Sequence, residues 1–324
     1  MKTLTSRSLP VLSAALLLSL TACSDPDASA TSASETATPP AGATGSVAYN
    51  TSPEQDRIRT EEDPALAAKV PEQISEDGRL TVATTAGSIP LTFHADDDTT
   101  VIGSEIDLAQ LVADKVGLEL DIQVTSWENW PLKTRSGDYE VVFSNVGVND
   151  ERLELFDFAS YRAAFMGFEA RTDSDLVVED FEDISGKTVS VGSGTNQEKI
   201  LLAWNEQLQK EGKDPASLQY YANDADTVLA LASGRLDLNL GPYPTAVYRE
   251  NTRDDLKVVG KINAGWPSET LVAATTLKDN GLAPVLTDAL NATIDDGTYR
   301  QVLERWGLEE EAVPAAELIT EDSR

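Results

Sequence analysis

The stretch TVSVGSGTNQE, residues 188–198, decides the fold class because a strand pattern turns into a helix pattern within it. Thr188–Val191 predicts a short strand, and the helical stretch Glu198–Lys210 follows after the glycine-containing turn Ser193–Gln197. A strand that leads through a tight turn into a helix is the repeating unit of α/β folds. The first N–H groups of such a helix suit a carboxylate. An ordinary helix cap is the slightly favoured alternative for this turn.

The same alternation runs outward from this stretch, beginning at Gly78. Leu80–Ala83 predicts a buried strand, Glu105–Val116 a helix, and the strict alternation in Leu118–Val124 a strand with one buried face. Further strands are expected at Glu140–Phe143, Leu236–Leu240 and Leu256–Val259, and further helices at Ala225–Ser233 and Leu282–Ile294. This pattern predicts an α/β protein with its sites at the carboxyl ends of the strands.

The composition excludes several classes of function. The 324 residues carry a formal charge of −30, and the clustered Lys and Arg that nucleic acid or anionic lipid would need are absent. His94 is the only histidine, and the acids Asp96–Asp98 after it predict an exposed loop and not a metal site. There is no nucleophile-elbow or phosphate-loop motif. We therefore expect no enzyme, no metal and no cofactor.

The N-terminus has the pattern of an export signal. Met1–Arg7 is basic, and Leu9–Leu20 is an apolar run too short to span a bilayer. The run ends in Leu-Thr-Ala-Cys23, which contains the only cysteine and resembles the lipobox of bacterial lipoproteins. This resemblance implies a signal peptide over residues 1–22 and acyl chains, such as palmitate, on Cys23. The alternative is an ordinary signal peptide with an incidental thiol. Residues 24–47 are poor in apolar side chains, so we expect a flexible tether, which we extend over residues 23–77.

Two further features are candidates for binding. Trp127 and Trp130 lie three residues apart and could form a stacking floor for a ligand, although core packing is the commoner use of such a pair. Arg152 is a solitary cation between Glu151 and Glu154. It either pairs with these acids at the surface or binds an anion.

Taken in order, a series of short motifs resembles the family 3 extracellular solute-binding proteins, the polar amino acid receptors of ABC importers. The motifs are Gly78–Val82, Gly103–Leu108, Trp127, Ser136–Glu140, Asn149–Leu153, Phe156–Phe158, Gly186–Val189, Ser233–Asp237, Gly297–Tyr299 and Trp306–Gly307. The resemblance covers about Gly78 to Leu308. It rests on the order and spacing of the motifs, since none of them is specific alone.

The resemblance implies a two-lobed, periplasmic-binding-protein-like (type II) fold. Lobe 1 would comprise residues 78–166 and 270–310, lobe 2 residues 167–269, and residues 311–324 would form a C-terminal tail. Phe168–Arg171 and Thr270–Ala274 would be the two hinge-crossing strands, on which the lobes close around the ligand.

The resemblance also implies the binding residues. Arg152 occupies the position of the arginine that grips the ligand α-carboxylate, a task for which its planar fork is suited. The other expected ligand-binding residues are Trp127, Asn145, Gly147, Ser88, Gly194, Thr195, Asn196 and Tyr243. Pro242 stands where the family places the aspartate that accepts the α-ammonium, and proline has no acceptor side chain. Asn145 and Gly147 replace small hydroxyl residues, and Ser88 lies near the position of a stacking aromatic. We therefore expect a ligand with a carboxylate and without a standard free α-amine.

The expected function is that of a monomeric receptor, lipid-anchored on the extracytoplasmic face of the cell membrane. It would deliver an amino acid or a related small carboxylate to an ABC permease and its ATPase. Two alternatives stay open: a dehydratase-like enzyme on the same fold, and a sensory binding module without transport.

Overall fold

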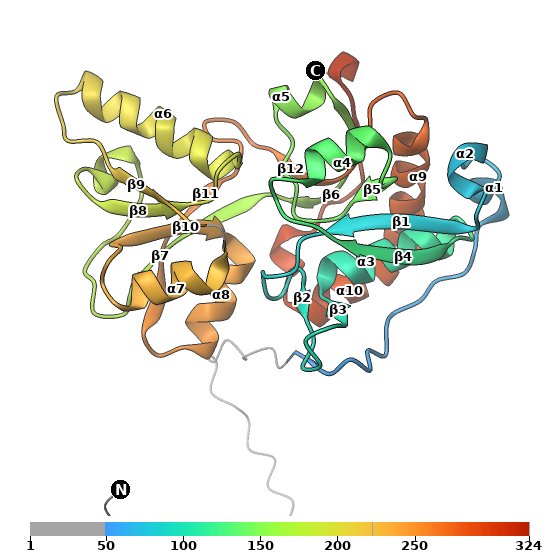
Figure 1. Cartoon of the computed structure of the whole chain (residues 1–324), viewed down its shortest axis with the longest axis horizontal. Coiled ribbons are helices and arrows are strands. Elements are labelled where there is room, and N and C mark those ends of the chain that lie inside the picture. The colour runs from blue at the N-terminus through green and yellow to red at the C-terminus, as the bar shows by residue number, and fades with distance from the viewer. Residues whose placement is uncertain (1–48, 222, 324) are drawn as a thin grey trace, which may run out of the picture. The chain divides into compact units, whose positions relative to one another are not determined.

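The computed structural model describes residues 49–221 and 223–323. The expected signal peptide and Cys23 lie outside these residues. The described chain forms two lobes side by side, each built on its own β-sheet (Figure 1). Among the described residues, none of the helices combines the length and the apolar character needed to cross a membrane.

Lobe 1 contains a six-stranded sheet in the order β13-β6-β12-β5-β1-β4. The strands β4, β1 and β5 are parallel, whereas β12 and β13 pair antiparallel with β6. The strands are β1 (Arg79–Thr84), β4 (Glu119–Val124), β5 (Val141–Val142), β6 (Phe156–Ala163), β12 (Leu271–Leu277) and β13 (Leu318–Ile319). The helices of this lobe are α1 (Pro64–Ala67), α2 (Glu72–Ser75), α3 (Ser104–Lys115), α4 (Trp130–Ser136), α5 (Asp150–Leu153), α9 (Leu282–Asp295) and α10 (Thr298–Trp306). A small hairpin joins β2 (Phe93–His94) to β3 (Val101–Ile102).

Lobe 2 contains a five-stranded sheet in the order β11-β7-β10-β8-β9, in which β10, β8 and β9 are parallel. The strands are β7 (Phe165–Arg171), β8 (Thr188–Val191), β9 (Ser217–Tyr220), β10 (Leu238–Pro242) and β11 (Leu256–Asn263). Its helices are α6 (Asn196–Lys210), α7 (Asp224–Ala232) and α8 (Tyr243–Thr252). The α/β prediction and the two-lobed fold are confirmed. The opening stretch forms β8, its turn and the start of α6.

The chain crosses between the lobes at positions that differ from those expected. The first crossing is at Ala164, between β6 and β7, and the second is residues 264–270, between β11 and β12. Hydrogen bonds join the two crossings: Ala264 donates to Ala164 at 2.9 Å, and Ala164 to Thr270 at 3.3 Å. Phe168–Arg171 lies within β7 of lobe 2, and Leu271–Ala274 lies within β12 of lobe 1. Strand patterns locate strands but not the sheet that each one joins.

The expectation of a flexible tether up to residue 77 is wrong for its described part, residues 49–77. Leu66, Val70 and Ile74, spaced four residues apart, belong to the main hydrophobic core. Arg57 and Arg59 form ion pairs with Asp107 and Asp114 of α3. Burial of these apolar side chains offsets the entropy of ordering the segment. The segment is therefore part of the folded lobe.

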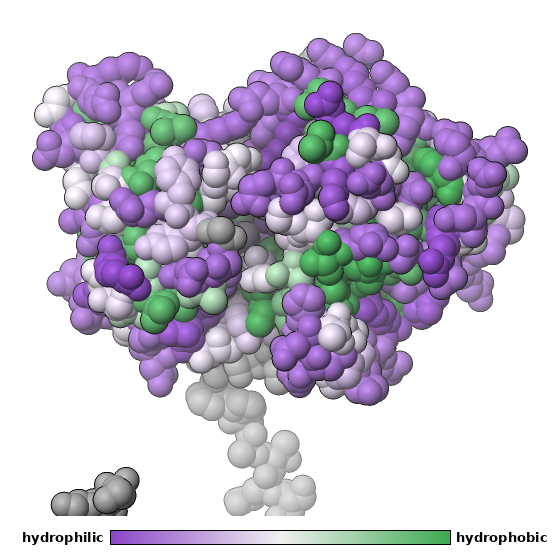
Figure 2. Space-filling model, in the orientation of Figure 1, coloured by the Kyte–Doolittle hydropathy of each residue, from purple (hydrophilic) through white to green (hydrophobic). Residues whose placement is uncertain are grey.

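The C-terminal residues 311–323 also pack on lobe 1. The carboxylate of Glu311 is buried and forms an ion pair with the fully buried Arg162, which also pairs with Glu105 of α3 at 2.9 Å. β13 then adds to the sheet next to β6, with Leu318 opposite Ala159. The space-filling view shows mostly hydrophilic residues on the visible face, with a group of hydrophobic residues on lobe 1 beside the boundary between the lobes (Figure 2).

Candidate functional site

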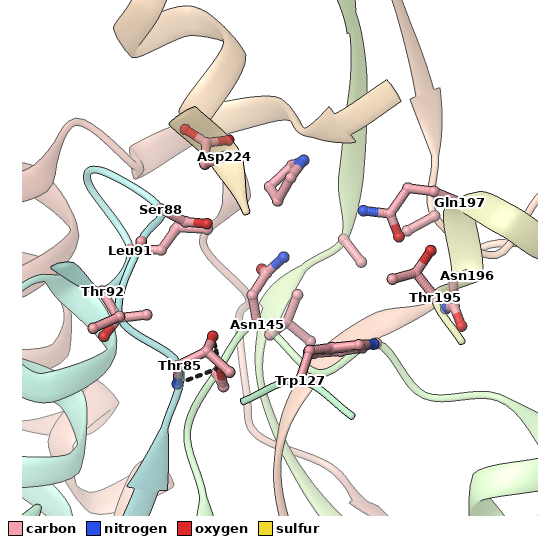
Figure 3. A pocket seen from close by; sticks show the side chains of 18 of the residues that line it. Thr85, Ser88, Leu91, Thr92, Trp127, Asn145, Thr195, Asn196, Gln197 and Asp224 are labelled. Atoms are coloured by element: carbon pink, nitrogen blue, oxygen red, sulfur yellow. Dashed lines mark hydrogen bonds between the residues drawn. The ribbon is translucent and has the colours of Figure 1, made fainter. Parts of the chain in front are cut away.

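A cavity of about 450 Å³, which we call the interlobe cavity, lies between the lobes (Figure 3). Its wall comes mainly from loops that follow the parallel strands β1, β4, β5, β8, β9 and β10. The lining residues at the ends of these strands, in the loops and in the first turns of α6 and α7 include Thr85–Ser88, Thr125–Glu128, Ser144, Asn145, Thr195–Gln197, Asn223, Asp224 and Pro242. The carboxyl ends of both sheets thus face one cavity, which is where open α/β sheets bind their ligands.

Arg152 is held in the wall of this cavity by α5. Asn149 caps this short helix by accepting a hydrogen bond from the Arg152 backbone N–H at 2.9 Å. The guanidinium donates to the Gly147 carbonyl at 2.5 Å and to the Gly194 carbonyl of lobe 2 at 3.1 Å. Arg152 is only 9% exposed. The guanidinium is therefore fixed at the boundary between the lobes.

The charge of Arg152 has no carboxylate partner among the described residues. Glu151 instead pairs with Lys199 at 2.7 Å. The guanidinium carbon lies 5.2 Å from the Trp127 ring centroid and 5.7 Å from that of Trp130. Burial lowers the pKa of Arg152 to about 10, and Glu151 opposes this shift. Arg152 is buried and forms no ion pair with Glu151 or Glu154, so the alternative of a surface arginine paired with its neighbouring acids does not describe this residue.

The start of α6 lies against the same guanidinium. Thr195 is the N-cap: its hydroxyl accepts from Glu198 N–H at 3.2 Å and donates to the Gly192 carbonyl at 2.7 Å. Thr195 and Asn196 line the cavity, whereas Gly194 contributes its carbonyl to Arg152 without being part of the lining. The helix is thus capped in the ordinary way and still directs its positive end toward the cavity.

Gly147 and Asn196 lie in close contact across the boundary between the lobes. A Cβ added at Gly147 would come within 2.8 Å of Asn196 Nδ2. Asn196 Oδ1 accepts a hydrogen bond from Asn149 Nδ2 at 2.7 Å. A glycine therefore permits this approach, and with a Cβ at position 147 the Asn196 amide would have to shift.

The two tryptophans have different positions. Trp130 is 1% exposed and packs on Phe156 in the core, with ring centroids 5.2 Å apart. Trp127 lines the cavity and meets Trp130 edge to face. Trp130 thus serves core packing, whereas Trp127 lies in the cavity wall, where a ligand can reach it.

Asn145 presents a donor to the cavity. Its Oδ1 accepts a hydrogen bond from Arg162 at 2.6 Å, so its Nδ2 is left for the cavity. Because arginine can only donate, this orientation is determined. Ser88 also lines the cavity, on the side where Asp224 lies in Figure 3. Asn145 thus directs its amide nitrogen, and not its oxygen, toward the cavity.

Tyr243 does not line the interlobe cavity, contrary to expectation. Its ring packs against the ammonium of Lys261, 4.2 Å from the ring centroid. Pro242, one residue earlier, does line the cavity, at the N-cap of α8. Because Pro242 and Tyr243 begin a helix, their side chains point in different directions. Of the nine expected ligand-binding residues, seven line the cavity, and Gly194 and Tyr243 do not.

Two acids of the lining, Glu128 and Asp224, were not expected from the sequence. Asp224 is the first residue of α7, directly after the N-cap Asn223. The order of elements indicates this position of Asp224, because Asp224 follows the carboxyl end of β9 just as Thr195 follows the carboxyl end of β8. Among the described residues, no group of His, Cys, Asp and Glu is arranged to hold a metal ion.

Comparisons with known proteins agree with this geometry. The sequence model of the bacterial extracellular solute-binding proteins, family 3, matches residues 80–309. The arginine-binding protein ArgT of Corynebacterium glutamicum is 28% identical over 249 residues, covering 76% of this chain and 80% of that protein. The L-cystine-binding protein TcyJ of Escherichia coli is 27% identical over 236 residues, covering 72% and 84%.

Solved structures share the fold. An ancestral arginine-binding protein bound to arginine superposes with a TM-score of 0.62 at 25% identity, covering 71% of this chain and 98% of that one. The ancestral amino acid-binding protein AncCDT-1, a precursor of cyclohexadienyl dehydratase, has a TM-score of 0.64 at 23% identity, covering 72% and 98%.

Proposed function

Because this chain belongs to the bacterial extracellular solute-binding proteins, family 3, we propose that it captures an amino acid or a related small carboxylate for an ABC importer. The ligand would bind in the interlobe cavity, and the lobes would close on it. The relatives named above bind arginine and cystine, which supports an amino acid or a close derivative as the ligand class.

The observation that carries this proposal is the state of Arg152. It is a buried cation at the boundary of the two lobes, and its described partners are carbonyl oxygens and aromatic faces. A ligand carboxylate would supply the missing counter-charge, and the start of α6 would add N–H donors from lobe 2. Trp127 would cover one side of the bound ligand. Such a ligand would hold both lobes at once.

Substitution of Arg152 tests this role. A thermal-shift screen over amino acids, their derivatives and small carboxylates identifies a ligand, and calorimetry measures its affinity. We expect Arg152→Ala to lose about 2–5 kcal/mol of binding free energy, because a buried charged partner is removed. Arg152→Lys should recover only part of it, since lysine lacks the bidentate fork.

The matched control is Arg135→Ala, which removes an exposed arginine at the end of α4, outside the lining of the cavity. It should bind like the unaltered protein. An affinity of Arg152→Ala within twofold of the unaltered protein would contradict the proposal, provided that its thermal unfolding shows an intact fold.

We further propose that acyl chains on Cys23 anchor a monomeric receptor to the extracytoplasmic face of the cell membrane, next to its permease and ATPase. The basic start, the short apolar run and the sole cysteine support this assignment. Cys23→Ala should yield a folded protein that no longer sediments with membranes. Retention of this variant on salt-washed membranes would argue against the anchor.

The interlobe cavity offers little support for an enzyme. Among the described residues, its lining contains no histidine, cysteine, lysine or tyrosine, and its titratable groups are Glu128, Arg152 and Asp224. Glu128 is exposed, and Asp224 pairs with Arg249. We therefore assign no catalytic residue, and a solute-binding role accounts for the lining.

A further inference from the structure

Asp224 lies at an unusual place in the wall of the interlobe cavity. It also lines a neighbouring cavity of about 580 Å³ between the loop at Gly87 and the helices α7 and α8, and Gly87 borders both cavities as well. Figure 3 shows Asp224 on the side of Ser88, and Trp127 and Thr195 on the opposite side. Because Arg152 contacts Trp127 and Gly194, the only cation of the described lining lies at the end away from Asp224.

The charge of Asp224 is only partly compensated within the protein. Arg249 donates through Nη2 to Asp224 Oδ1 and through Nη1 to Glu169 Oε2. Glu169 is 1% exposed and so depends on Arg249 for its counter-charge. One guanidinium thus serves two carboxylates, and the cluster has an excess of negative charge on its cavity side. Burial raises the pKa of Asp224, and Arg249 opposes this shift, as expected for a carboxylate short of positive partners.

One oxygen of Asp224 is available to a ligand. Among the described residues, Oδ1 has Arg249 as its donor, and none donates a hydrogen bond to Oδ2. The oxygens of the neighbouring amides already accept hydrogen bonds within the protein and carry no charge to balance a cation. Asn239 donates to Glu169 and accepts from Ser190, and Asn145 directs its oxygen to Arg162. Asp224 is therefore the best-placed acceptor for a positive group at this end of the cavity.

We propose that Asp224 binds a cationic group at the end of the ligand remote from its carboxylate, and thereby selects carboxylates with a distal guanidinium or ammonium. This inference rests on the proposed function, since it places the ligand carboxylate at Arg152. Opposite charges at the two ends of the interlobe cavity match such a ligand in both position and sign. A neutral isostere would leave Oδ2 without a partner and would bind more weakly.

Two pairs of probes of nearly equal shape isolate the distal charge: L-arginine with L-citrulline, and L-lysine with L-norleucine. The experiment measures their affinities by calorimetry for the unaltered protein, for Asp224→Asn and for the control Asp226→Asn. Asp226 lies in the same first turn of α7, is exposed, and does not line the interlobe cavity. The control therefore removes the same charge from the same helix without touching the ligand.

In at least one pair, we expect the unaltered protein to prefer the cationic member at least tenfold. Asp224→Asn should reduce this preference to threefold or less, and Asp226→Asn should preserve it. A purely structural role of Asp224 as partner of Arg249 would weaken both members equally and leave the ratio unchanged, which would overturn the proposal.

The two proposals can fail separately. If the unaltered protein binds neutral or acidic carboxylates in an Arg152-dependent way and neither cationic probe preferentially, Asp224 does not select a cation, while the proposed function stands. If no small carboxylate binds at all, the proposed function fails, and the role of Asp224 fails with it.

Discussion

At the scale of single residues, the interlobe cavity is defined by two charges that the protein compensates only in part and by one proline. Arg152 was recognisable as a solitary cation between Glu151 and Glu154, whereas its burial comes from Trp127 and the Gly194 carbonyl. Pro242 lines the cavity at the N-cap of α8, where it provides no acceptor. A ligand α-ammonium near this ring would be desolvated without a counter-charge.

We predict that the free α-amine of the ligand is dispensable. A deaminated analogue, such as 5-guanidinopentanoate in place of L-arginine, should bind within tenfold of the amino acid. Pro242→Asp should create a preference for the free amine, because it adds a carboxylate to the cavity wall at a position where helices accept aspartate as a cap. Calorimetry with each amine and its analogue measures this preference.

Pro242→Ala is the control, because it removes the ring without adding an acceptor, and it should show no new preference. If the unaltered protein already needs the free amine by tenfold or more, another group replaces the missing aspartate.

At the scale of elements, α3 links the core of lobe 1 to the cavity. Its residue Glu105 pairs with Arg162 at 2.9 Å, and Arg162 orients the Asn145 side chain. The helix begins after Gly103, whose φ of +127° is rarely accessible to other residues. A Cβ at Gly103 would lie 2.3 Å from the Leu91 carbonyl oxygen. The start of α3 therefore requires glycine for conformation and for space.

We predict that Gly103→Ala destabilises the protein by more than about 3 kcal/mol, because backbone strain and a backbone clash act together. The matched control is Gly78→Ala, at φ +75° with no atom within 4 Å of the added Cβ. It should cost only about 1–2 kcal/mol, the strain of a left-handed residue. Urea unfolding of both variants measures the difference, and equal losses would contradict the role of the clash.

At the scale of the whole molecule, two covalent crossings, a few polar contacts and the ring contact of Tyr49 with Tyr248 connect the lobes. On the side of α5 and α6, these contacts are Arg152 with Gly194, Asn149 with Asn196, and Glu151 with Lys199. They are few and polar, so the lobes can separate at small cost. A ligand that binds Arg152 and the start of α6 gains its full contacts only when the lobes are together. It should therefore favour the closed arrangement.

We predict that a saturating ligand decreases the radius of gyration of the Cys23→Ala chain in small-angle scattering. The same ligand concentration should leave the radius of gyration of the Arg152→Ala variant unchanged. This variant lacks the contact between Arg152 and the ligand that stabilises the closed arrangement. An identical radius with and without ligand, at a concentration where calorimetry shows saturation, would rule out closure on binding.

The sequence by itself determined the features that depend on near neighbours along the chain. The α/β class follows from local periods, and the opening stretch predicted β8, its turn and α6 within two residues. Arg152 as the carboxylate-binding candidate and Pro242 as an unusual residue followed from the resemblance of the motifs around them to those of the family. In each case the information lies within a few residues, because strands, turns and helix starts are specified locally.

Only the tertiary structure determined which of these residues line the interlobe cavity together. In the structure, Asp224 lines the interlobe cavity and Tyr243 does not. The chain crosses between the lobes at Ala164 and at residues 264–270, and not at the expected positions. Residues 49–77 also pack onto lobe 1. Arg162, which orients Asn145, donates a hydrogen bond to Glu311, which lies 149 positions later in the chain. Such partners are determined by burial and by the cost of leaving a buried charge unpaired, and no local pattern in the sequence specifies them.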